Sequence, residues 1–357
     1  VVDIELVYLV LGNLALRLPV TQTLLNGLRP DKFEVAWEGA WTFYPFRVLV
    51  RGLAANGQSR RQQWQFEMHQ GSASISLLPL VLKHVSLHDV VGENVLYYQR
   101  PRLKPDNDYA DTREFFPPIR NRVLNDAEPL PAGKRPWTVS VANASVLGRH
   151  TVWLYQLRAV VEGELQGSFR YQTRGGPFSL RDGRVDLVAD DVVINGNRDA
   201  FNNIVVRGVV EFSEFVPREN KGVDALPFLT MDAELGAAVN SLAFLDFYLH
   251  HLEGMRLDGR GLVSGRVNVD RGTLRAGTRL DVTAPELSLE LLDHRASGSG
   301  TVRLDVDLDT PDRLSVFVEF SELIARRLGD DRRLLVGSGL VVDCLLYTSP
   351  SPRDFKY

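Results

Sequence analysis

Histidines and carboxylates at short spacings are the residues of this 357-residue chain that could bind a metal or transfer protons. His84 and His88 are four residues apart, a spacing that would suit a metal ion on a helix. The surrounding KHVSLHDV is typical of a strand entering a turn, where residues four apart lie about 13 Å from each other. We therefore expect two solvent-exposed histidines. His250 and His251 are adjacent on an expected helix and point in different directions, so no metal site is expected there.

Asp305, Asp307 and Asp309 alternate along one expected strand. Such a row could bind calcium or exchange protons. Arg303 belongs to the same row, which favours a solvated strand face. The sequence has no glycine-rich phosphate loop, nucleophile elbow or zinc-ligand spacing. It therefore predicts a protein that is not an enzyme and uses no cofactor or metal.

The elements that would position these residues are strands. Between residues 255 and 320 apolar and polar residues alternate with a period of two, most clearly in GTVRLDVDLD at 300–309. Short loops between such strands indicate an antiparallel meander with one apolar and one polar face. The residues expected to line the apolar face are Val263, Val267, Val269, Leu280, Val282, Leu287, Leu289, Leu291, Val302, Leu304, Val306, Leu308, Val316 and Val318.

Glycines inside these strands indicate curvature. Gly259, Gly261, Gly265, Gly298 and Gly300 interrupt the alternation. Interior glycines often mark a bulge or a bend, and a bent sheet can form a trough. The expected fold is therefore mainly β: an elongated, curved antiparallel sheet forming an open groove, with a short N-terminal helix and one amphipathic helix at 240–254.

The N-terminal segment leaves two interpretations open. Residues 6–18 are almost wholly apolar, but a bilayer span needs roughly 20 apolar residues. Residues 1–18 are then a signal-like or buried helix, or a membrane anchor truncated at Val1. Asp3 and Glu5 count against the anchor.

The remaining chain is expected in four parts. Residues 19–99 form an N-terminal β region, with a short helical turn opened by Pro79. Residues 100–136 hold seven prolines and are expected to be a loop or linker. Strands return over 137–343, with a hairpin turn at Asp182–Gly183. Residues 344–357 include LLYTSPSPRD, which resembles translated sequencing-adapter sequence, so we expect a non-native tail without regular structure.

The overall composition excludes some functions. The formal net charge is −4 and both signs alternate along the chain, so no basic patch for nucleic acid is expected. Hydrophobic residues make up 44% and charged residues 24%, which excludes a largely disordered chain. The only cysteine, Cys344, falls in the suspected tail, and a chain without cysteine suits an oxidising compartment such as the periplasm.

Several stretches resemble the AsmA/TamB-like proteins of the bacterial cell envelope. They are VRGL (50–53), SASISLLPLVLKHVSLHDVVGENVLYY (72–98), LGRHTVWLYQLRAVVEGELQGSFRY (147–171) and RLDGRGLVSGRVNVDRGTL (256–274). The resemblance covers most of Leu6 to Asp343, through loose strand patterns rather than catalytic signatures. It implies an anchor in the inner membrane through the N-terminal helix, with the bulk of the chain in the periplasm.

The resemblance also implies a function. An apolar β-groove would carry phospholipid acyl chains between the inner and outer membranes without enzymatic activity, with an outer-membrane protein as a further partner. Two alternatives remain open. The chain could be an assembly factor for outer-membrane proteins that binds by strand addition, or a β-sandwich binding domain whose apolar faces pack on each other.

Overall fold

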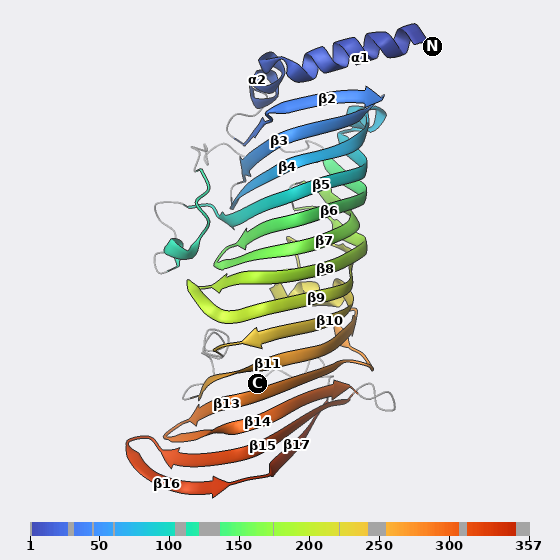
Figure 1. Ribbon diagram of the computed structural model, residues 1–357. Helices are drawn as coiled ribbons and strands as arrows, with labels where there is room; N and C mark the ends of the chain where they lie inside the picture. The colour runs from blue at the N-terminus through green and yellow to red at the C-terminus, as the bar shows by residue number, and fades with distance from the viewer. Residues whose placement is uncertain are drawn as a thin grey trace. The chain divides into compact units, whose positions relative to one another are not determined.

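The structure is a computed structural model, and it describes residues 2–27, 32–44, 46–59, 61–103, 112–120, 136–173, 175–220, 222–241, 255–306 and 313–347. The fold is mainly β, as predicted. The chain divides into two compact units: unit 1 is Val1–Leu187 with Glu211–Val223, and unit 2 is Val188–Val210 with Asp224–Tyr357. In each unit the strands pair edge to edge in an open sheet rather than in two packed layers (Figure 1).

Unit 1 begins with two helices and continues with long strands. The helices are α1 (Val2–Arg17), α2 (Pro19–Gly27) and the short 3₁₀ turns η1 (Leu78–Leu82) and η2 (Arg113–Phe115). The strands are β1 (Phe33–Ala36), β2 (Gly39–Tyr44), β3 (Arg47–Gln58), β4 (Gln62–Ser76), β5 (His84–Pro101), β6 (Thr138–Leu154) and β7 (Leu157–Gln172). β8 (Phe178–Ile194) and β9 (Asn197–Phe215) contribute residues to both units. The short helical turn expected at Pro79 is confirmed as η1.

Among the strand pairs described in unit 1, from β1 to β7, all are antiparallel except one. β5 and β6 pair in parallel, from His84 opposite Thr138 to Gln99 opposite Leu154. The expected antiparallel sheet thus contains a parallel pair, and the sheet is mixed. Parallel neighbours cannot be joined by a tight turn, so the chain between these strands must return from the end of β5 to the level of its start.

Part of this connection is packed rather than loose. The guanidinium of buried Arg100 donates to the carbonyl oxygen of Pro117 at 3.0 Å and to that of Ile119. The indole N–H of Trp153 donates to the carbonyl oxygen of Phe115 at 3.0 Å. Residues 112–120, within the expected linker at 100–136, thus contact the sheet.

Helices α1 and α2 lie along the edge strands β1 and β2 (Figure 1). The Asn13 side chain accepts a hydrogen bond from Thr42 N at 2.8 Å and donates to Thr42 O at 2.7 Å. Asn26 makes the same pair of bonds to Val35, at 2.8 and 3.0 Å. Each amide replaces a neighbouring strand and satisfies an exposed edge. Among the described residues, no helix has the length and apolar character needed to cross a bilayer.

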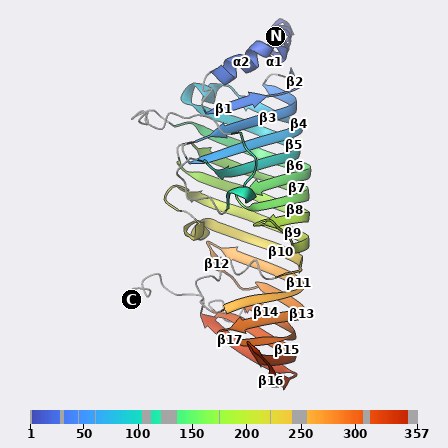
Figure 2. The ribbon, with the colours of Figure 1, turned by 90° about the vertical axis from the view of Figure 1, so that its left-hand side faces the viewer.

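Unit 2 is antiparallel throughout its assigned pairs. Its strands are β10 (Leu229–Val239), β11 (Met255–Asp270), β12 (Thr273–Leu274), β13 (Arg279–Leu291), β14 (His294–Val306), β15 (Arg313–Arg327), β16 (Asp330–Gly337) and β17 (Leu340–Tyr347), and the turn η3 (Gly222–Phe228) precedes them. These strands follow the alternation seen in the sequence, and they are bent rather than straight (Figure 2).

Three expectations need correction or fall outside the described residues. Asp182–Gly183 is not a hairpin turn: β8 runs through it, and Asp182 takes a positive φ of 53° as an irregularity within the strand. The tail is not wholly irregular, since β17 includes Cys344 and pairs with β15. The helix expected at 240–254 and the tail beyond Tyr347 lie outside the described residues, except for 240–241.

Candidate functional site

The predicted apolar residues of unit 2 fall into rows that run across the strands. In antiparallel pairs, residues directly opposite each other share a face. Pairing registers align one row of Ala237, Val263, Val282, Val302, Val318 and Val342. The next row is Leu235, Gly265, Leu280, Leu304, Val316 and Cys344. Alternation within each strand and register between strands therefore place these positions on one continuous face, here called the apolar face.

Burial along the apolar face of unit 2 is uneven. Val267, Val269 and Val306 are buried, with Val306 only 1% exposed. In the two rows Val263, Leu280, Val282, Val302 and Leu304 are only half-buried, whereas Ala284, further along β13 on the same face, is buried. Side chains between two packed layers would be buried along the whole strand. The two rows thus keep apolar surface in contact with solvent.

The other predicted residues continue the same face beyond a bend. Leu287 is half-buried and stands opposite Gly298, which stands opposite Leu323. For Leu289, Leu291, Val316 and Val318 only the register position is described, and it agrees with the same face. Leu308 lies outside the described residues.

Glycines mark the bend, as expected. Gly259 takes φ +154°, and register shifts occur beside Gly261 on β11 and Gly300 on β14. A Cβ at Gly298 would lie 1.8 Å from the carbonyl oxygen of Glu322 on β15. Only glycine allows the neighbouring backbone to approach so closely, so these positions bend the sheet.

The opposite face of unit 2 is polar and paired. Arg266 on β11 donates to both carboxylate oxygens of Asp232 on β10, at 2.6 and 2.5 Å. Asp281 accepts from Arg303 at 2.7 Å and from Arg279 at 2.9 Å, and these bonds lower the pKa of its carboxyl. The Arg266 bond likewise lowers the pKa of Asp232. These exposed pairs give the face solubility rather than chemistry.

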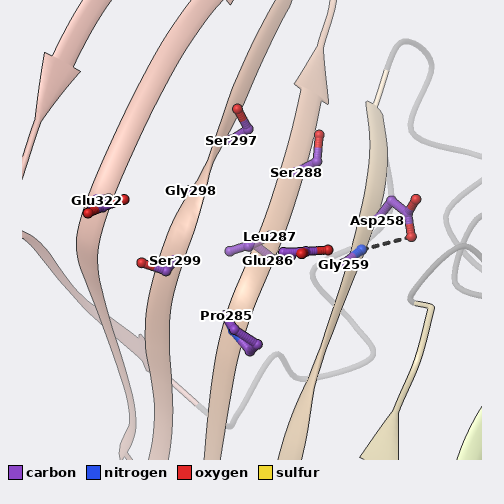
Figure 3. Close-up of a pocket in the computed structure, with 10 residues that line it drawn as sticks. All are labelled: Asp258, Gly259, Pro285, Glu286, Leu287, Ser288, Ser297, Gly298, Ser299 and Glu322. Carbon is purple, nitrogen blue, oxygen red and sulfur yellow. Dashed lines mark hydrogen bonds between the residues drawn. The ribbon is translucent and has the colours of Figure 1, made fainter.

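A shallow hollow of about 410 Å³ lies on this polar side, across the bend (Figure 3). Asp258, Glu286, Ser288, Ser299 and Glu322 are among its lining residues. Asp258 accepts from Gly259 N at 2.7 Å, and Glu286 pairs with Arg260. The hollow is open and three carboxylates, of Asp258, Glu286 and Glu322, lie in its lining, so it does not suit an acyl chain. Within the described chain no cluster of histidines, cysteines or carboxylates could hold a metal ion.

The histidines singled out in the sequence are structural. His84 Nε2 lies 2.7 Å from Ser140 Oγ, and His88 Nε2 lies 3.1 Å from both Ser76 Oγ and Ser86 Oγ. Both rings are half-buried on β5, so the expectation of solvent-exposed side chains is wrong, while their placement on a strand is right. His250, His251, Asp307 and Asp309 lie outside the described residues.

Unit 1 has a comparable face that the predicted site did not include. One row is Ala55, Phe66, Tyr97, Val152 and Ala159, and the next includes Leu53, Met68 and Val95. Most of these side chains are half-buried. Burial raises the pKa of Tyr97. The alternation Trp64–Phe66–Met68 was a usable signal for this face, but the direction of the β5–β6 pair was needed to align it with β6.

Comparison of the chain with protein-family models, with curated proteins and with solved structures found no match. The fold and the apolar face therefore carry the functional argument.

Proposed function

We propose that this protein is a non-enzymatic lipid carrier whose apolar β-face accommodates phospholipid acyl chains. The observation that carries the proposal is the pair of cross-strand rows in unit 2, aligned in register and half-exposed at Leu280 and Leu304. A soluble protein seldom leaves contiguous apolar surface in water unless something binds there. The resemblance to AsmA/TamB-like proteins supports the same function, with the bulk of the chain in a bacterial periplasm and its N-terminal helix at the inner membrane.

The physical need for such a face follows from the substrate. A phospholipid has on the order of 30 acyl methylenes, each worth about 0.8 kcal/mol for leaving water. Exposing both chains would cost roughly 20 kcal/mol or more. Movement through an aqueous space therefore needs a surface that shields the chains throughout. Neighbouring strands about 4.8 Å apart, each with the same apolar face, supply such a surface without any catalytic group.

The test is Leu304→Asp, a charge placed in the middle of the apolar rows. Because Leu304 is half-exposed, the new carboxylate can reach water when lipid is absent, so the fold should survive denaturant unfolding with a modest loss of stability. Phospholipid that co-purifies with the protein, quantified by mass spectrometry, should fall sharply.

The matched control is Thr301→Asp, which adds the same charge to the exposed polar face of the same strand. It should leave bound lipid unchanged. A folded Leu304→Asp protein with undiminished lipid would refute the proposal. A loss of several kcal/mol in the free energy of unfolding would instead indicate that position 304 is covered in solution.

Strand addition is less well supported as an alternative function. The edge formed by β1 and β2 is already occupied by the Asn13 and Asn26 side chains, which take the hydrogen-bonding positions that an added strand would need.

A further inference from the structure

A second exposed apolar feature lies away from the rows of unit 2, at the turn between β4 and β5. We define the apolar tip as Leu77, Leu78, Val81 and Leu82. Leu78 is 87% exposed and Val81 84% exposed, whereas Pro79 and Leu80 are half-buried beneath them. Lys83 closes the turn in a left-handed conformation, with its N–H donating to Leu80 O at 2.9 Å. The turn therefore has a fixed shape that presents its aliphatic side chains outwards.

Aromatic residues flank the apolar tip at neighbouring strand ends. Phe46 O accepts from Ile75 N at 2.7 Å, which places Phe46 beside the end of β4. On the other side Lys83 O accepts from Thr138 N at 2.9 Å, so Trp137 adjoins the start of β5. Phe46 and Trp137 are both exposed.

Helix α1 extends the same surface. Its Tyr8 ring meets Phe46 edge to face, with ring centroids 5.7 Å apart. Tyr8 accepts a hydrogen bond from Phe46 N and Asn13 bonds to Thr42 on β2, while most of the large apolar residues of α1 are exposed. The exposed large apolar residues on α1 are Leu6, Val7, Val10, Leu11 and Leu14.

The chemistry of this surface favours one occupant. The aliphatic side chains of this turn are exposed, so a protein partner would have to supply a pocket for them, whereas a bilayer needs none. An apolar apex with aromatic flanks and nearby cations, here Arg47 and Lys83, is instead the composition of segments that enter the boundary between headgroups and acyl chains. Basic side chains at that depth attract anionic headgroups. We propose that the apolar tip inserts into the interface of an anionic bilayer. This assigns unit 1 a membrane contact that does not depend on lipid binding to the apolar face.

Site-specific fluorescence tests the insertion directly. In a chain with Cys344→Ser, Leu78→Cys is labelled with an environment-sensitive fluorophore and mixed with vesicles of phosphatidylglycerol and phosphatidylcholine. The label should shift to the blue, and doxyl groups in the upper acyl chain should quench it. The control is Leu292→Cys, at a 73% exposed leucine in unit 2, and it should show neither effect. An unchanged spectrum at position 78 in sedimented, vesicle-bound protein would overturn the proposal.

A charge variant measures the contribution of the tip to binding. Leu78→Asp with Val81→Asp should lower vesicle partitioning about tenfold or more, because charged side chains are strongly disfavoured in the interface, while Leu292→Asp should not. Both positions are exposed, so the fold should be retained. Lipid loading in solution should be retained as well, which separates this result from failure of the carrier proposal. Equal partitioning of the variant, or a vesicle-independent dimer that the variant abolishes, would refute insertion.

Discussion

His150 on β6 is a buried titratable residue. It lies two residues from Val152, on the same side of the sheet in unit 1. Its ring is 1% exposed, and Nδ1 accepts a hydrogen bond from Val95 N at 3.2 Å. Acceptance at Nδ1 requires the neutral ring, and burial lowers the pKa of His150 below its ordinary value. Protonation would therefore place a charge among Val95, Val161 and their neighbours and break the bond.

The stability of the protein should consequently depend on pH through His150. In the unfolded chain His150 binds a proton near pH 6.5, whereas in the folded chain its ring stays neutral to lower pH. The contribution of His150 is thus complete above pH 6.5 and is lost as the pH falls towards the folded-state pKa. Denaturant unfolding at pH 7.5 and 5.5 should show a stability loss that His150→Phe reduces. His69→Gln, at an exposed histidine on β4, should keep the full loss, and an unaltered loss in His150→Phe would contradict this assignment.

At the scale of elements, β14 and β15 approach each other closely at Gly298. Gly298→Ala places a methyl group against the carbonyl oxygen of Glu322, so β14 and β15 must separate. We expect a loss of about 1–3 kcal/mol in the free energy of unfolding, typical of overpacking. Gly337→Ala on β16 has no atom within 4 Å of the added Cβ and should be nearly neutral. Equal effects in both variants would mean that the bend does not need glycine.

At the scale of the whole molecule, the edge-to-edge pairing predicts that a destabilising substitution affects only its own strand and the neighbouring strands. Each strand contacts mainly its neighbours, as in repeat proteins whose stability is a sum of adjacent terms. Val306→Ala, at a buried position on β14, should cost about 2 kcal/mol. Hydrogen exchange should accelerate in β13, β14 and β15 and stay unchanged in β3 to β6. Val336→Ala, at an exposed position, is the control; uniform loss of protection would show that the molecule unfolds as one body.

The sequence predicted most of this architecture where the information is local. Alternation at Val302 and Leu304 identifies β14 and its apolar side, Pro79 opens η1, and the glycines lie at the bends. Long-range information was missing elsewhere. The Ser140 partner of His84 is 56 residues away and gives no signal near the histidine.

Two features of the fold differ from what the sequence predicted, and each difference has a physical cause. Asp182–Gly183 has the composition of a turn, but a positive φ at Asp182 also suits an irregular point within a strand, and only the neighbouring strand decides between them. The parallel direction of β5 and β6 depends on the route of the connecting chain, because alternation is the same in either direction.

That parallel pair also sets the order in which the sheet can be built. Most other neighbouring strands are joined by short turns, so each strand can pair with the preceding one as soon as it is present. β5 and β6 are separated by about 36 residues, whose closure costs roughly 3 kcal/mol of chain entropy before any pairing is gained. No tight turn sets the register there; one side-chain bond between the two strands, in which Asn94 Oδ1 accepts from Arg149 N, adds to the pairing of their backbones. The β5–β6 pair can therefore form only once the residues between the two strands are present, whereas strands joined by short turns can pair as soon as both are present.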